Sequence, residues 1–355
     1  MNGWLERLRP PHRRGSAAGA VGIVDAARPA DEAPSCAGSD AFAPTRLLWS
    51  RGLALLCDHH GGTAFVREQR GGHSALRFDP ESYAHVGDGE LVWVRATALP
   101  QFVQEALPRI RARFALVSGD EDWSIPSEFD GAAILCAHDN LLCWFAQNYD
   151  GGDRSGKILP LPIGMDFHTI SNGPRWGHAQ ASPAQQEAQL QALRSAMLPN
   201  ARRRLRVHAD FHFNRHSRPL MGETRAEVEA VLRANPLIDF QRRKLARARL
   251  WRNKTRYAFT VSPHGNGLDC HRTWESLALG NIVIVRHSPL DPLYEGLPVV
   301  IVDCWQDITA ENLARWHTQF QHVFSEQQFA DKLTNRYWIE RMRSTLRERM
   351  ARALR

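Results

Sequence analysis

One loop in the second half of the sequence carries residue types that suit an anionic ligand. Residues 257–262 are expected to form a strand that runs into this loop, where Gly265 and Gly267 let the backbone approach a ligand closely. A helix follows, and its free N–H groups and positive dipole end would point at that ligand. His271 and Arg272 occupy the first turn, where the dipole disfavours cations unless an anion binds between them.

A carboxylate in the same helix extends this interpretation. Glu275 lies one turn further on, where it would accept hydrogen bonds from neutral hydroxyls such as a ribose diol. Phosphate beside a diol is typical of a nucleotide, although an ordinary surface loop before a plain helix has the same spacing. The remaining polar candidates of this segment are Ser262, His264, Asn266 and Asp269.

A second basic cluster follows another predicted strand, at residues 205–211. Arg215 and Arg218 come directly after it, where they would neutralise negative charge on a leaving nucleoside diphosphate. A solvated basic loop is the alternative interpretation. Lys254 and Arg256 are weaker candidates for the same task.

The elements that must position these residues alternate between strand and helix, which favours parallel α/β sheets. A junction is expected between residues 172 and 203, giving a flexible N-terminal arm over 1–45, one Rossmann-like domain over 46–200 and a second over 201–355 with closing C-terminal helices. In the first domain we predict helices over 101–111 and 140–147, and strands over 47–56, 91–95, 114–117, 132–137 and 157–163. In the second we predict helices near 223–233, 240–252, 311 and 338, and strands over 205–211, 257–262, 282–285 and 299–302.

Composition narrows the protein class without deciding the function. The 355 residues are 43% hydrophobic and 23% charged, close to globular averages, and no apolar run is long enough to span a bilayer. Only four of the 45 basic residues are Lys, so the net charge of +7 reflects compositional bias as much as selection for a polyanion. Six cysteines without a C-x-x-C pair indicate reduced thiols, and without a secretory leader we expect a cytoplasmic protein, peripheral at the inner face of the membrane at most.

The loop and helix resemble a known family. Residues 262–280, the apolar run 282–285 and the following stretch 288–300 resemble the exostosin-like glycosyltransferases (glycosyltransferase family 47 and relatives). Residues 144–148 and 157–168 resemble segments of exostosin-related proteins more loosely. The resemblance implies a GT-B fold, in which two Rossmann-like domains face a cleft and the C-terminal one holds a nucleotide-sugar donor.

The resemblance also implies roles for individual residues. Arg272 would contact the donor diphosphate, Glu275 would contact the ribose, and Gly265 and Gly267 would give clearance for the phosphates. Where the family usually has Ser-Arg before the helix, this chain has His271 and Arg272, which places a second, titratable cation beside the phosphates. The implied reaction is inverting glycosyl transfer to a hydroxyl acceptor, in surface-glycan or glycoconjugate synthesis, with no divalent metal expected.

Inverting transfer needs a base for the acceptor hydroxyl, and in a GT-B cleft this base would come from the N-terminal domain. Three strand ends offer candidates: Asp120 with Asp122, His138 with Asp139, and Asp166 with His168. We favour Asp120 or Asp122, because two carboxylates in one tight loop can raise the pKa of one of them.

Two other functions stay open. Asp120 and Asp122 also form a D-x-D motif, typical of metal-dependent GT-A glycosyltransferases, although the second α/β series would then be unused. A non-catalytic nucleic-acid-binding protein would use the net charge, but no zinc finger or RNA-recognition signature accompanies it. The expected partners are a nucleotide-sugar donor and a glycan, lipid-linked or protein acceptor, with no specific nucleic acid.

Overall fold

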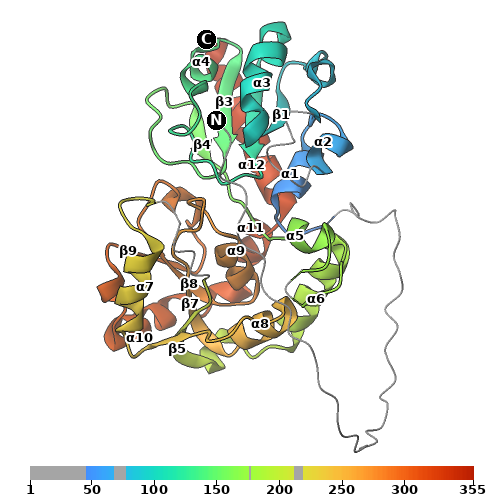
Figure 1. Ribbon diagram of the computed structural model, residues 1–355. Coiled ribbons are helices and arrows are strands. Elements are labelled where there is room, and N and C mark those ends of the chain that lie inside the picture. Colours follow the sequence, from blue (N-terminus) through green and yellow to red (C-terminus); the bar gives the residue numbers. More distant parts are fainter. Residues whose placement is uncertain (1–44, 68–76, 176, 212–218) are drawn as a thin grey trace, which may run out of the picture. The chain divides into compact units, whose positions relative to one another are not determined.

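The computed structural model describes residues 45–67, 77–175, 177–211 and 219–355. The arm predicted over residues 1–45 lies outside the described residues, apart from Thr45. Two parallel sheets organise the described chain (Figure 1). We refer to the part built around the first sheet as the first half, and to the part around the second sheet as the second half.

The first sheet has four parallel strands in the order β1-β2-β3-β4. They are β1 (Glu90–Arg95), β2 (Phe114–Gly119), β3 (Leu141–Ala146) and β4 (Ile158–Pro160). Helices of this half are α1 (Ser50–Leu56), α2 (Thr63–Arg67), α3 (Leu99–Gln101) continued by a π-helical turn over Phe102–Ala106, α4 (Ala132–Ala137) and α5 (His168–Ser171). The next helix, α6 (Pro183–Ala196), packs against α8 (Arg247–Lys254), as Figure 1 shows. The inner strands are buried on both faces, as expected of parallel strands covered on both sides.

The second sheet has five parallel strands in the order β6-β5-β7-β8-β9. They are β5 (Arg204–Ala209), β6 (Ile238–Phe240), β7 (Tyr257–Val261), β8 (Ile282–Arg286) and β9 (Val299–Val302). The helices are α7 (Arg225–Arg233), α8 (Arg247–Lys254), α9 (His271–Ala278), α10 (Ala310–Phe320), α11 (Gln327–Lys332) and α12 (Asn335–Ala353). The strand order reverses between β5 and β7, and ligands of open α/β sheets bind beyond the carboxyl ends of strands at such a point.

The predicted pair of Rossmann-like α/β halves is therefore confirmed, but three predicted elements are wrong. The supposed strand over 132–137 is α4, the supposed helix over 140–147 is β3, and most of the supposed strand over 47–56 is α1. Each is a short apolar run, and such runs suit a buried strand and a buried helix equally well. The domain boundary predicted at residue 200 falls between α6 and β5 and stays a prediction.

Two hydrophobic cores use opposite faces of the second sheet. Along β8, Ile282 and Ile284 belong to the core under α7 and α10, whereas Val283 and Val285 face the other way. That other core is continuous with the core of the first sheet, and Trp274 and Leu277 of α9 are part of it. The face that carries α9 is thus packed as the interior of one body with the first half.

The chain returns to the first half at its C-terminal end. α12 packs against β1, β3 and α1, and Figure 1 shows it beside β3. Backbone hydrogen bonds join Leu48 N–H to the Leu333 carbonyl and Asn335 N–H to the Arg46 carbonyl. The closing helix assigned to the second domain from the sequence therefore completes the first half.

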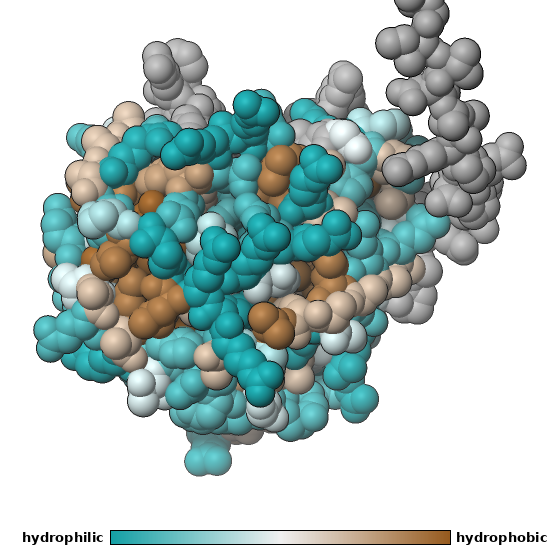
Figure 2. Space-filling view, turned by 90° about the horizontal axis from the view of Figure 1, so that it is seen from below, coloured by the Kyte–Doolittle hydropathy of each residue, from teal (hydrophilic) through white to brown (hydrophobic). Residues whose placement is uncertain are grey.

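The surface is mostly hydrophilic on the face that Figure 2 shows, where hydrophobic side chains form separate patches. No helix among the described residues is long and apolar enough to cross a membrane.

Truncating Leu346 in α12 should destabilise the protein, because this side chain is fully buried in the core of the first half. Leu346→Ala is expected to lower the free energy of unfolding by about 2–5 kcal/mol. Exposed Arg347 on the same helix provides the control, and Arg347→Ala should change it by less than about 0.5 kcal/mol. Urea denaturation followed by circular dichroism measures both, and equal effects would show that α12 is not part of this core.

Candidate functional site

The predicted ligand loop lies at the switch point of the second sheet. β7 ends at Val261, the loop spans residues 262–270, and α9 begins at His271 beside the end of β5. Ser262 is buried, and its hydroxyl lies 2.9 Å from the Thr273 hydroxyl in the first turn of α9. The sequence therefore located both the loop and the start of the helix correctly.

The two glycines make room for protein atoms. A Cβ on Gly265 would lie 3.0 Å from Cys270 Sγ, and a Cβ on Gly267 would lie 2.7 Å from the Asn148 side chain. Gly267 is thus needed for the approach of Asn148 from the first half, and its predicted role of giving clearance to phosphates stays a prediction. The neighbouring Asn266 is exposed.

Asp269 fastens the loop to the first half. Its carboxylate accepts hydrogen bonds from Ile163 N–H at 2.8 Å and from the Trp274 indole at 2.8 Å, and its own N–H donates to Asn148 Oδ1 at 2.9 Å. Burial raises the pKa of Asp269 to about 6 in spite of these donors. With its carboxylate occupied inside the protein, Asp269 is a structural residue and not the donor contact that we predicted.

Arg272 lies where a diphosphate was predicted. Its Nη1 donates to the Pro263 carbonyl at 3.0 Å and lies 3.4 Å from Ser262 Oγ, and its guanidinium sits 5.6 Å from the centre of the Phe211 ring. Its Nε lies 3.4 Å from Oδ1 of Asp210, at the end of β5. Oxygen atoms held near two of its nitrogens restrict the orientation of this guanidinium.

Arg225 is a second cation at this loop, and the sequence reasoning missed it. It is the first residue of α7, and its Nε donates to the His264 carbonyl at 2.9 Å. Burial and then the charge of nearby Arg272 lower the pKa of Arg225. The Thr224–Glu227 capping box could have revealed that Arg225 begins a helix.

Four other predicted donor residues have different outcomes. His264 turns its Nδ1 to the Leu268 carbonyl at 3.0 Å, which stabilises the loop itself. Glu275 is 9% exposed and accepts a hydrogen bond from the Trp251 indole at 3.0 Å. That contact gives Glu275 a packing role and does not support the predicted ribose contact. Arg215 and Arg218 lie outside the described residues, in the segment that follows β5.

The acidic loop after β2 is organised by two buried arginines. Asp120 has φ +63° and pairs with Arg51 at 3.1 Å and Arg95 at 2.6 Å. Burial raises the pKa of Asp120, but the two guanidinium charges outweigh it and hold that pKa below its ordinary value. Our reason for choosing Asp120 as the base is therefore wrong, and a carboxylate neutralised by two arginines does not fit the metal-binding D-x-D alternative.

The raised pKa belongs instead to the residue between the two predicted carboxylates. Burial, only partly offset by Arg95, raises the pKa of Glu121 to about 7. Asp122 is exposed, and its charge acts on Arg225 and Cys270 of the second half. The acidic loop thus lies close to the predicted ligand loop over residues 262–270.

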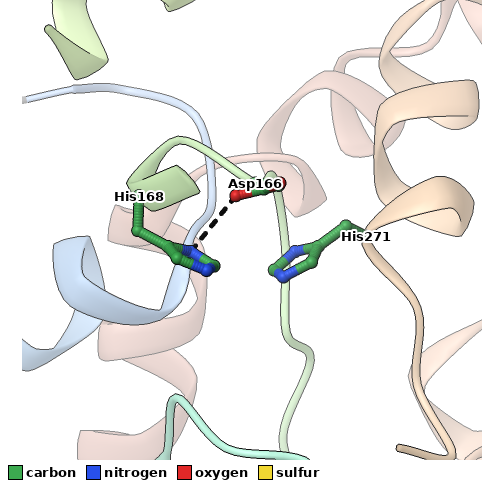
Figure 3. A group of neighbouring side chains, drawn as sticks. All are labelled: Asp166, His168 and His271. Carbon is green, nitrogen blue, oxygen red and sulfur yellow. Dashed lines mark ion pairs between the residues drawn. The ribbon is translucent and has the colours of Figure 1, made fainter. Parts of the chain in front are cut away.

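Asp166 and His168, the third predicted pair, meet His271 of α9. Nδ1 of His168 lies 3.3 Å from Asp166 Oδ1, and the rings of His168 and His271 are 5.4 Å apart (Figure 3). Nδ1 of His271 lies 2.8 Å from the Gly164 carbonyl, which can only accept, so Nε2 of the neutral ring carries the lone pair. Two imidazoles from different halves therefore face a common space, each with Nδ1 held by an oxygen.

These three side chains are also a candidate metal site, because their ligand atoms lie within 4.8 Å of one another. The surroundings of Asp166 argue against that use. Its Oδ2 pairs with Arg247 at 3.0 Å, and its Oδ1 accepts from Thr169 N–H at 3.0 Å. A carboxylate engaged by a buried guanidinium and a backbone donor suits the orientation of His168 better than metal coordination.

A pocket of about 190 Å³ opens over this cluster, and both halves line it. The lining residues are Ser50, Arg51, Arg95, Asp120, Glu121, Asp122, Ile163, His168 and His271. Larger hollows of about 590 Å³ beside β6 and 570 Å³ beside α4 have none of the predicted site residues in their walls. The pocket over His168 thus brings together predicted residues of both halves.

Comparison with known proteins gives distant structural likenesses only. No family model matches the chain, and no curated protein matches it. UDP-forming α,α-trehalose-phosphate synthase of Burkholderia vietnamiensis is similar at 13% identity and a TM-score of 0.41, over 79% of this chain and 78% of that one. A trehalose-6-phosphate protein of E. coli bound with UDP-2-fluoro glucose is similar at 12% identity and a TM-score of 0.36, over 78% and 77%. At such TM-scores these likenesses carry no argument, and the two-sheet fold rests on the strands themselves.

Replacing the Asp269 carboxylate by an amide should weaken the junction between loop and first half. The amide NH₂ cannot accept, so at least one of the N–H groups of Ile163, Cys270 and Trp274 loses its buried partner. At pH 7, Asp269→Asn is expected to lower the free energy of unfolding by about 1–3 kcal/mol. Exposed Asp303 is the matched control, since Asp303→Asn removes the same charge without a buried partner. Similar small changes in both variants, measured by urea denaturation, would contradict the assignment.

Proposed function

We propose that the protein is a glycosyltransferase that moves a sugar from a nucleoside-diphosphate sugar to a hydroxyl acceptor, with inversion and without a metal. One observation carries the proposal. His271 and Arg272 are consecutive in the first turn of α9, yet His271 faces His168 in the pocket while Arg272 faces the loop of the second half. A phosphate site and a candidate base therefore lie on the two sides of one helix start, as transfer between two substrates requires.

The donor site would be formed by Arg272, Arg225 and the N-terminus of α9. Two guanidinium groups that repel each other gain from an anion placed between them, and the helix start adds unpaired N–H groups. The same cations would stabilise the charge that develops on the leaving diphosphate, which a bound metal otherwise does. Both are thus placed to act on the donor bond that breaks.

His168 is the base that this geometry favours. Its Nε2 would take the proton of the acceptor hydroxyl while the acceptor oxygen bonds to the anomeric carbon and the diphosphate leaves with the bonding electrons. Asp166 Oδ1 lies 3.3 Å from Nδ1, so its negative charge favours the tautomer that carries the proton on Nδ1. Burial lowers the pKa of His168, with Asp166 and Asp120 opposing that effect in part, so the ring is neutral at pH 7.

The finer assignments follow from the sequence alone. Membership of the exostosin-like family, a part in surface-glycan or glycoconjugate synthesis, and a cytoplasmic location at the membrane's inner face are proposals from the motif and the composition. The acceptor hydroxyl would belong to a glycan, a lipid-linked sugar or a protein. The pocket over His168 is the site where that acceptor would bind.

Nucleoside diphosphates should bind the wild-type protein, and Arg272→Ala should weaken binding at least about 100-fold, because a charged hydrogen-bond partner of the phosphates is lost. Calorimetry with UDP, GDP, CDP and ADP measures this directly. Arg243→Ala removes an exposed arginine of the same half and should leave the dissociation constant unchanged. A wild-type protein that binds none of the four would overturn the proposed function.

Replacing the proposed base should affect catalysis and not donor binding. With the preferred donor, His168→Gln is expected to lower kcat by about 10²–10⁴-fold while the dissociation constant of the nucleoside diphosphate stays unchanged. Because the pKa of His168 is lowered, wild-type kcat should fall only below about pH 6.5, as the ring gains its proton. His322→Gln, at an exposed histidine, should leave kcat and its pH profile as in the wild type.

Treatment with EDTA distinguishes His168 acting as a base from His168 acting as a metal ligand. Activity that persists in EDTA agrees with His168 acting as a proton acceptor. Loss of activity in EDTA that Zn²⁺ restores would instead assign Asp166, His168 and His271 to a metal ion.

A further inference from the structure

A buried carboxylate lies beside the proposed diphosphate site, where its charge would oppose an anion. Asp210 comes directly after β5, at the switch point of the second sheet, and its side chain is 4% exposed. Its Oδ1 lies 3.4 Å from Arg272 Nε, and its Oδ2 lies 2.9 Å from Lys254 Nζ. A buried carboxylate beside an anion site is unfavourable unless a positive charge compensates it.

Lys254 supplies the compensating charge. Its side chain is 1% exposed, and its Nζ also donates to the Ser276 hydroxyl of α9 at 3.1 Å. Burial raises the pKa of Asp210, but Lys254 and then Arg272 outweigh it and bring that pKa down to about 2. Asp210 is therefore ionised at neutral pH and balanced by Lys254, which limits its repulsion of a nearby phosphate.

Arg272 is held at two of its nitrogens. Asp210 forms an ion pair with Nε at 3.4 Å, and Nη1 donates to the Pro263 carbonyl and lies near the Ser262 hydroxyl. Among the described residues Nη2 has no acceptor, which leaves it for a phosphate oxygen. A guanidinium fixed in this way loses less freedom when it binds a phosphate oxygen.

We propose that Asp210 is a positioning residue that orients Arg272 for the donor diphosphate. The proposal rests on the proposed function, because it takes Arg272 as the diphosphate ligand. Asp210 touches Arg272 and Lys254 and acts on the donor only through the guanidinium that it holds.

The sign of the effect separates positioning from simple charge. Removing the Asp210 charge relieves repulsion of an anion, so a purely electrostatic neighbour predicts tighter binding of a diphosphate in Asp210→Asn. Loss of orientation predicts weaker binding, about 10-fold. The matching nucleoside lacks phosphates and should bind Asp210→Asn as it binds the wild type.

A double-mutant cycle tests whether Asp210 acts through Arg272. Calorimetry with UDP, GDP, CDP and ADP and their nucleosides is carried out on the wild type, Asp210→Asn, Arg272→Gln and the double variant. We expect the 10-fold loss in the wild-type background and less than about twofold in the Arg272→Gln background. The same loss in both backgrounds, tighter binding in Asp210→Asn, or equal loss for diphosphate and nucleoside would each overturn the proposal.

A second variant without a buried charge controls for loss of folding in Asp210→Asn. Asp210→Asn leaves Lys254 buried without its partner, which destabilises the fold, so Asp210→Asn with Lys254→Met repeats the measurement without a buried charge. Asp210→Glu, which keeps the carboxylate, should recover part of the affinity.

Crystal structures of the ligand-free wild type and Asp210→Asn separate this proposal from the proposed function. If no nucleoside diphosphate binds the wild type, the function fails, and the Arg272 side chain still decides the positioning role. A guanidinium that leaves its place in Asp210→Asn supports the role, and one that keeps its place overturns it.

Discussion

The site depends on a carboxylate that two parts of the chain share. Asp269 belongs to the loop after β7, but it accepts a hydrogen bond from Ile163 of the first half, and Asn148 of that half accepts from its backbone. Because only Cys270 separates Asp269 from the start of α9, these contacts fix where the helix begins and hence the positions of His271 and Arg272. The His271 imidazole and the Arg272 guanidinium are therefore positioned by one buried set of hydrogen bonds.

The local sequence pattern was sufficient to predict the ligand loop and the two elements beside it. The loop with Gly265 and Gly267, the strand before it and the helix after it follow from turn residues and periodicity, and the structure has them. The exchange of α4 and β3 shows the limit, because each is an apolar run of six residues that neighbours alone assign. The partners of Asp120 show it again, since Arg51 lies 69 residues away and only the fold brings it to 3.1 Å.

Charges at the two sides of α9 are handled differently. Near Arg272, buried Asp210 and Lys254 balance each other, and the guanidinium remains available to an anion. In the wall of the pocket, Arg51 and Arg95 form ion pairs with Asp120. Their positive charges are therefore balanced by this carboxylate and attract a ligand less than the charge of Arg272 does. The sequence alone could not show which of these charged residues are available to a ligand. Burial and ion pairing decide that and set the pKa values, and both depend on contacts between distant segments.

The path of α12 bears on how the chain is made. The face of β1 and β3 that receives this helix is covered by residues 335–353, which are synthesised after the whole second sheet. During synthesis the strands of the first sheet therefore keep an apolar face exposed until α12 has been made. A chain shortened before α12 would present that uncovered face to chaperones and proteases.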